Sequence, residues 1–246
     1  GVKADRVALS NASWAGPEPM LTAERLTIGI AAADLIAGKV RVTELSAVLP
    51  QLNLSTREDG TGNWVLERPT AADVQTPASS PGAFDSLPVS IEALNLTGAT
   101  LRYAPFGEAP VEMRQVDVAL AWPDPTGTVD MDVTLRPAGA PVRVVGEIGT
   151  FAAFLAGEVS SIGASITAKD TELRFDGRAE LTGAASGRLT GRSTDLGATL
   201  AAFGVAPGAE LPKIGEWLVG ADATYTSDGR LALRDLSLSA DENRIT

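Results

Sequence analysis

The sequence contains no cysteine and no histidine. Without thiols the chain cannot form disulfides or zinc–thiolate centres, and it has no cysteine nucleophile. Without imidazole it cannot assemble a histidine-based catalytic triad. These absences exclude only those chemistries. Together with the arguments below, we predict a protein that is not an enzyme, with no catalytic residue, no metal site and no cofactor. The lack of cysteine fits a cytosolic and an exported protein equally well.

Aromatic residues and positive charge are also scarce. Phe, Trp and Tyr make up 5% of the chain, so any core or ligand surface must be built mainly from aliphatic side chains. The 20 Lys and Arg residues are outnumbered by 31 Asp and Glu, which gives a net charge of -11. This charge argues against a nucleic-acid partner and against adhesion to anionic lipid headgroups by charge alone. It does not exclude uptake of lipid tails into an apolar channel.

Long hydrophobic runs are absent as well. The best candidate, IGIAAADLIAG, is interrupted by Asp34 and is shorter than the roughly 20 residues that a membrane-spanning helix needs. No signal peptide is recognisable at the start of the chain. Because the chain opens almost directly into a strand and stops soon after another, we expect it to be a piece of a longer polypeptide.

The dominant pattern in the sequence is alternation of apolar and polar residues. It is strict in TVDMDVTLR at 128–136 and nearly so in ELRFDGRAEL at 172–181. Such alternation predicts antiparallel strands that have one apolar and one solvated face. From these segments we take seven candidates for the lining of an apolar groove: Val129, Met131, Val133, Leu135, Leu173, Phe175 and Leu181.

Turn signals and short helical segments complete the fold prediction. Turns are expected at TSDGR (226–230) and at FDGR (175–178), the latter as a turn or as a bulge inside a strand. Segments 31–38, 149–157 and 194–205 are rich in Ala and Leu, carry a Gly at or near the end, and resemble one another. Each predicts one to three helical turns. The fold class is therefore mainly β, an antiparallel sheet of repeated strand units with a few short helices.

One segment has a different composition. Residues 69–88 contain four prolines among small and polar residues, which is typical of a linker or a long loop. It divides the chain into a first β region at 1–68 and a second at 89–246. We expect the second region to hold two of the short helices and to continue beyond the fragment.

The stretch EDGTGNW at 58–64 predicts a tight structural turn. Asp59 and Gly60 form a strong hairpin signal, Asn63 can close a turn by bonding its own backbone, and Trp64 can cover the turn. A calcium loop would need more carboxylates, and a phosphate-binding loop would need a lysine and a following helix. Three Asn-X-Ser/Thr triplets, at Asn11, Asn53 and Asn95, are also interpreted as structural.

The order of features from residue 10 to residue 64 resembles the N-terminal region of the AsmA family of bacterial envelope proteins. It runs through a small residue and Trp14, the strand pattern LTAERLTIGI, a short Ala/Leu helix, the pattern VRVTELSAVLPQLNL, and the Asp-Gly-x-x-Asn-Trp turn. The most specific residues are Asp59, Gly60, Asn63 and Trp64. Residues 195–208 also look like the C-terminal part of that family.

The resemblance implies a location, a fold and a function. AsmA-like proteins are typically anchored in the inner membrane of Gram-negative bacteria by an N-terminal helix, with the remainder in the periplasm; that helix is absent here. Their repeated β units form an elongated, curved sheet with an apolar groove along which phospholipid is thought to move between membranes. The expected partners are phospholipid acyl chains and an envelope protein, because relatives are tied to outer-membrane biogenesis and protein assembly. The family supplies no catalytic residues.

Two questions stay open at the level of sequence. An open groove and a closed β-sandwich both need strands with one apolar face, although scarce aromatics and many small apolar residues favour the groove. Glycosidase chemistry would need two carboxylates that converge in a cleft. The pairs Asp130/Asp132 and Glu172/Asp176 are instead best explained by solvated strand faces. A non-enzymatic module that recruits partners through an exposed strand edge is the alternative function.

Overall fold

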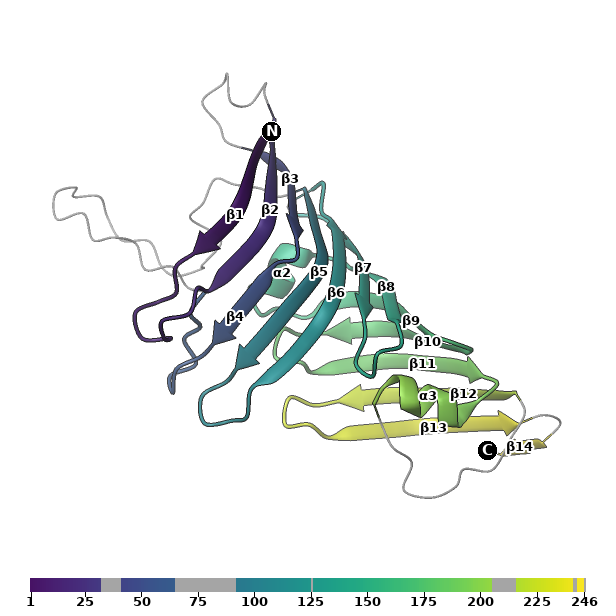
Figure 1. Ribbon diagram of the computed structural model, residues 1–246. Coiled ribbons are helices and arrows are strands. Elements are labelled where there is room, and N and C mark those ends of the chain that lie inside the picture. The colour runs from purple at the N-terminus through teal and green to yellow at the C-terminus, as the bar shows by residue number, and fades with distance from the viewer. Residues whose placement is uncertain (32–40, 65–91, 125, 205–215, 241–242, 246) are drawn as a thin grey trace. The chain divides into compact units, whose positions relative to one another are not determined.

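The computed structural model describes residues 1–31, 41–64, 92–124, 126–204, 216–240 and 243–245. The described chain is mainly β, with short helices, as the alternation predicted (Figure 1). It divides into two compact units. The first comprises Gly1–Ile91 and Leu96–Arg114, and the second comprises Glu92–Asn95 and Gln115–Thr246, so β5 (Ala93–Ala104) and β6 (Val111–Ala121) contribute residues to both. The predicted linker at 69–88 lies largely within 65–91, outside the described residues.

In the first unit, β1 (Val2–Leu9), β2 (Leu21–Ile30) and β3 (Val42–Val48) are consecutive antiparallel neighbours. β4 (Gln51–Ser55) pairs antiparallel with β2 and parallel with β5. The chain breaks between β3 and β4 at Leu49, which has a φ of 48°, and at buried Pro50. Proline has no N–H to donate to a central ladder, which accounts for the interruption at this position.

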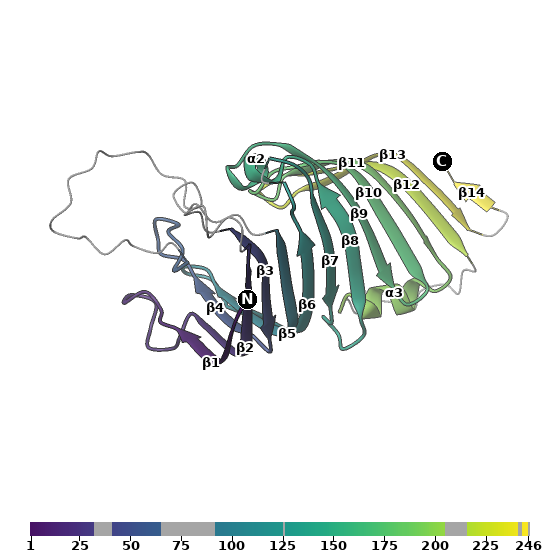
Figure 2. The same ribbon diagram turned by 90° about the horizontal axis from the view of Figure 1, so that it is seen from above.

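In the second unit, consecutive strands are neighbours throughout the sheet order from β6 to β14 (Figure 2). The strands after β6 are β7 (Val129–Leu135), β8 (Val142–Ile148), β9 (Ser160–Ala168), β10 (Thr171–Ala179), β11 (Ala185–Ser193), β12 (Trp217–Tyr225), β13 (Leu231–Ala240) and β14 (Asn243–Ile245). All the pairs given for these strands are antiparallel.

Two of the three predicted helices are present in the second unit. α2 (Phe151–Leu155) connects β8 to β9, and α3 (Leu196–Ala202) connects β11 to β12. The segment predicted at 31–38 falls almost wholly on residues outside those described. Among the described residues, no helix has the length and apolar character required to cross a bilayer.

The turn signal FDGR was interpreted wrongly as a turn or bulge. Asp176 and Gly177 lie in the middle of β10, and their pairing is unbroken with β9 on one side and β11 on the other. Two flanking ladders stabilise the extended backbone against the local turn preference of Asp-Gly. At TSDGR the prediction is confirmed, since Thr226 N–H donates to Arg230 O at 3.0 Å and Gly229 has a φ of 83°.

Candidate functional site

An uninterrupted apolar face runs across the sheet of the second unit. The register places Met131 opposite Gly146, Gly146 opposite Ala164, Ala164 opposite Phe175, and Phe175 opposite Leu189. Residues directly opposite each other on neighbouring strands stand on the same face of a sheet. A second row along this face contains Val118, Val133, Val144, Ile166, Leu173, Gly191, Val219 and Leu238.

The middle of this face is only half-buried. Its large side chains all keep intermediate exposure, and they include Met131, Val133, Val144, Ile166, Leu173, Phe175, Leu189 and Val219. The described strands of this unit belong to one sheet and form no second sheet packed on it. The described part of the unit is therefore an open sheet and not the closed sandwich that the sequence had left possible.

Paired glycines allow β10 and β11 to approach closely on the apolar face. Gly177 of β10 lies opposite Gly187 of β11, and both have apolar-face parity. A Cβ atom on Gly177 would lie 2.3 Å from the carbonyl oxygen of Ser186, and one on Gly187 would lie 2.3 Å from that of Asp176. Glycine at both positions is what permits so close an approach of the two backbones on the apolar face.

The two short helices flank the apolar face at opposite ends of the strands (Figure 2). β8 and β11 run in opposite directions, because they are three positions apart in an antiparallel strand order. The connections that follow them therefore lie at opposite ends of the strands. At one end of the strands, Ala202 of α3 packs on Val142 and Ala168. At the other end of the strands, the ring of Phe151 in α2 packs edge-to-face against the Trp122 ring, with the ring centroids 4.9 Å apart. α2 and α3 thus form a rim at each end of the strands, and the open part of the apolar face lies between these two rims.

Hydrogen bonds fix α3 to its rim. Asp195 caps the helix by accepting from Ala198 N–H at 2.8 Å. Buried Thr199 hydrogen-bonds through its hydroxyl to Thr171 and to Ser193, the latter at 2.9 Å. Because each hydroxyl has a partner, this buried cluster is satisfied and holds the helix in place.

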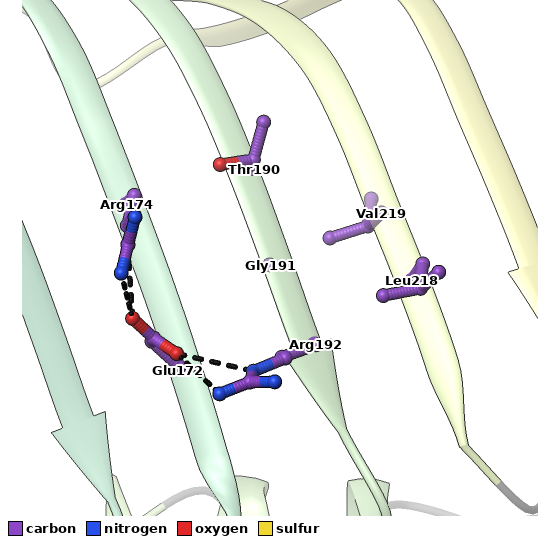
Figure 3. Close-up of a pocket in the computed structure, with 7 residues that line it drawn as sticks. All are labelled: Glu172, Arg174, Thr190, Gly191, Arg192, Leu218 and Val219. Atoms are coloured by element: carbon purple, nitrogen blue, oxygen red, sulfur yellow. Dashed lines mark hydrogen bonds and ion pairs between the residues drawn. The ribbon is translucent and has the colours of Figure 1, made fainter.

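The opposite face of the same sheet is polar and ion-paired. Arg143 donates to Asp132 at 2.9 Å, and this hydrogen bond lowers the pKa of the Asp132 carboxyl. Glu172 accepts hydrogen bonds from Arg174 at 2.9 Å and from Arg192 at 3.1 Å (Figure 3). Both guanidinium groups lower the pKa of the Glu172 carboxyl, and Arg174 has the larger effect. A general acid needs a raised pKa, so both carboxylates are better suited to ion pairing than to proton transfer.

A shallow hollow of about 400 Å³ lies beside the Glu172 cluster (Figure 3). Its lining comes from three neighbouring strands: Glu172 and Arg174 of β10, Thr190, Gly191 and Arg192 of β11, and Leu218 and Val219 of β12. Both arginines of the cluster already bind Glu172, so this hollow offers no unpaired charge to a ligand. Among the described residues, no group of three or more acidic side chains is arranged to hold a metal ion.

Six of the seven sequence-derived groove candidates stand on the apolar face. Val129 is buried, while Met131, Val133, Leu135, Leu173 and Phe175 are half-buried. Leu181 is 54% exposed and lies in the turn after β10. The sequence reasoning did not name Val144, Ile166, Leu189 or Val219. Alternation could have found them, but Gly and Ser residues interrupt the apolar pattern in their strands.

The turn at 56–63 is built around Asn63. The buried Asn63 side chain accepts from Ser55 N–H at 2.9 Å and donates to Asn53 O at 2.7 Å and to Asn11 Oδ1 at 2.8 Å. The sequence predicted that Asn63 bonds its own backbone, whereas its partners lie 8 to 52 positions away. Asn11 and Asn53 thus have structural roles, as expected.

The other three predicted turn residues lie around this side chain. Asp59 accepts from Thr61 N–H at 2.9 Å, which lowers the pKa of its carboxyl, and Gly60 adopts a φ of 81°. The Trp64 ring covers Gly62, where a Cβ atom would lie 2.3 Å from the indole. Trp64 itself remains 41% exposed.

A scan against protein-family models, a search of curated proteins and a search of solved structures each find no match to this chain.

Proposed function

We propose that the second unit binds phospholipid acyl chains on its open apolar face. The observation that carries this proposal is the row of half-buried apolar side chains between α2 and α3, on the face of the sheet opposite the ion-paired one. Each methylene group removed from water contributes roughly 0.8 kcal/mol. Two chains of about sixteen carbons would therefore supply ample free energy without any single specific side chain, even after the cost of association.

We further propose that the chain is part of an AsmA-like protein of the Gram-negative periplasm. In this proposal the full-length protein is anchored in the inner membrane and supports outer-membrane biogenesis by conducting phospholipid. The support is the resemblance of residues 10–64, together with an open sheet of the kind that the resemblance implies. The location and the direction of transport rest on this analogy and not on the geometry.

Two neighbouring valines of β8 allow a matched test of the lipid site. Val144 stands on the apolar face, whereas Val145 stands on the polar face and is 41% exposed. Lipid that co-purifies from bacterial cells would be quantified by native mass spectrometry and identified after extraction. We expect defined phospholipid on the wild type and on Val145→Asp, and a loss of at least about tenfold on Val144→Asp, because a carboxylate in the groove would have to be desolvated.

Thermal unfolding of both variants serves as the folding control. If Val144→Asp is folded and retains as much lipid as Val145→Asp, the apolar face is not the binding site. A wild-type protein that carries no phospholipid, and takes up none from vesicles, would also contradict the proposal.

The alternative function is an interaction module for envelope protein assembly, and one observation favours it. On β13, Leu231 is 62% exposed and Leu236 is 50% exposed, and the given pairing of β14 reaches only Leu238–Ala240 of that strand. The remaining edge could accept a further strand by addition to the sheet. Saturable binding of an extended peptide at this edge by a lipid-free chain would favour the module over the conduit.

A further inference from the structure

A hollow of about 480 Å³ lies in the first unit where three connections meet. It is lined by Trp14, Ala15, Ser55, Thr56, Arg57, Glu58 and Phe106. Hydrogen bonds hold the connections together. Phe106 N–H donates to Thr56 Oγ1 at 3.2 Å, and Asn63 ties the Trp14 connection through Asn11. The turn at 56–63 thus forms one side of this hollow, and through Asn63 it also holds the connection that contains Trp14.

The hollow presents two opposite charges side by side. The guanidinium carbon of Arg57 lies 4.5 Å from the centroid of the Trp14 ring, which holds the cation over an aromatic face. Glu58 is the next residue, and both side chains are exposed. Neither forms a salt bridge with another residue in the described part of the chain. Arg57 also interacts electrostatically with the Asp59 carboxylate two positions further on. Because both side chains are exposed, both charges remain accessible to a ligand.

The rest of the lining supplies apolar contact and an unused hydroxyl. Phe106 is 60% exposed although it is tied by its backbone to Thr56. The hydroxyl oxygen of Ser55 is buried beside the hollow and has no hydrogen-bond partner. A buried polar atom without a partner usually marks a place where a ligand or water completes the site.

We propose that this hollow binds a zwitterionic group that joins a phosphodiester to an ammonium ion. Arg57 would pair with the phosphodiester, because a guanidinium group is well suited to phosphate oxygens. Glu58 would pair with the ammonium ion, and the rings of Trp14 and Phe106 would contact the carbon atoms between them. A simple anion would be repelled by Glu58 and a simple cation by Arg57. Phospholipid headgroups and free glycerophosphodiesters share this chemistry.

This site is distinct from the acyl-chain face of the second unit, so it can be tested with ligands that have no acyl chains. Binding of glycerophosphoethanolamine would be compared with that of glycerol phosphate and of ethanolamine by titration calorimetry, and by the NMR signal of the tryptophan indoles. We expect the zwitterion to bind at least about tenfold more tightly than either fragment, since each lost charge-assisted contact costs about that factor.

Three variants make the test specific. Arg57→Gln and Glu58→Gln should each weaken binding of the zwitterion about tenfold, while Glu58→Gln should not weaken binding of glycerol phosphate. Arg25→Gln removes an exposed arginine that pairs with Asp5 on the first-unit sheet, and it should leave binding unchanged. Thermal unfolding verifies that all three variants are folded.

Vesicles distinguish the two sources of this chemistry. Binding to vesicles of phosphatidylethanolamine and phosphatidylglycerol, but not of phosphatidylglycerol alone, identifies a lipid headgroup. Binding of the soluble ester without vesicle binding identifies a free phosphodiester. Absence of binding by every ligand, or a Glu58→Gln variant that behaves as the wild type, overturns the proposal. Neither result affects the lipid bound on the second unit, which the β8 valine variants measure separately.

Discussion

At the scale of single residues, the Asn63 side chain contributes more to the stability of the first unit than its place in a polar turn indicates. Replacement by Ala would leave Ser55 N–H and Asn53 O without their partner and would release Asn11. Buried polar groups that lose a partner cost about 1–3 kcal/mol each, although such costs do not add fully. We expect Asn63→Ala to lower the free energy of unfolding of the first unit by about 3 kcal/mol, measured by denaturant titration.

Trp64→Ala provides the comparison at the neighbouring position. The Trp64 ring packs on Gly62 and lies 6.5 Å from the Tyr103 ring between centroids, but it is 41% exposed. Its truncation should lower stability by about 1 kcal/mol, because only part of its apolar surface is buried. An unchanged midpoint for Trp64→Ala, or a larger loss than for Asn63→Ala, would contradict this ranking.

At the scale of strands, the glycine pair of β10 and β11 provides a test of how closely these strands must approach. A Cβ atom on Gly177 would lie 2.3 Å from the Ser186 carbonyl oxygen, and that oxygen belongs to a paired backbone that cannot move cheaply. We therefore expect Gly177→Ala to destabilise the second unit by about 1–3 kcal/mol and to reduce bound lipid by disturbing the apolar face. Thermal unfolding and native mass spectrometry measure the two effects.

Gly163 of β9 is the matched control. Its neighbour in register on β10 is Asp176 on the polar face, and a Cβ atom there would meet nothing closer than Asp176 Oδ1 at 3.6 Å. Gly163→Ala should therefore be neutral or stabilise the unit by up to about 1 kcal/mol, since it reduces the freedom of the unfolded chain. Equal losses from the two substitutions would show that the close approach at Gly177 is not what matters.

The strands also show what could be read from the sequence and what could not. Alternation identified the apolar faces of β7 and β10, because Asp, Glu and Arg occupy nearly every second position there. It missed the contributions of β9 and β11, where Gly, Ser and Thr blur the contrast between the faces. Only the register reveals that Ile166 and Leu189 continue the face. The partners of Asn63 were equally hidden, since a contact with Asn11 over 52 positions leaves no local pattern.

At the scale of the whole molecule, the composition and the ion pairs together determine how stability depends on pH. The chain has no histidine or cysteine, so no side chain with an ordinary pKa titrates between about pH 5.5 and 7.5. The folded-state pKa values of Asp132 and Glu172 are lowered by their arginine partners. A lowered carboxylate pKa contributes stability above the unfolded-state pKa, and that stability is lost as pH falls through the folded value. We expect a flat thermal midpoint near neutrality and a decline below about pH 4.5.

A decline in acid could also come from general charge repulsion, because the 20 Lys and Arg residues are no longer balanced below the isoelectric point near 4.5. Glu172→Gln separates the two causes. The variant cannot form the ion pairs with Arg174 and Arg192, so its midpoint should lie below that of the wild type at pH 7. The gap should narrow as the pH falls through the lowered folded-state pKa of Glu172, because the wild-type carboxyl then becomes neutral as well. If instead the gap stays constant across the whole acid decline, the ion pairs of Glu172 contribute nothing to the pH dependence of stability.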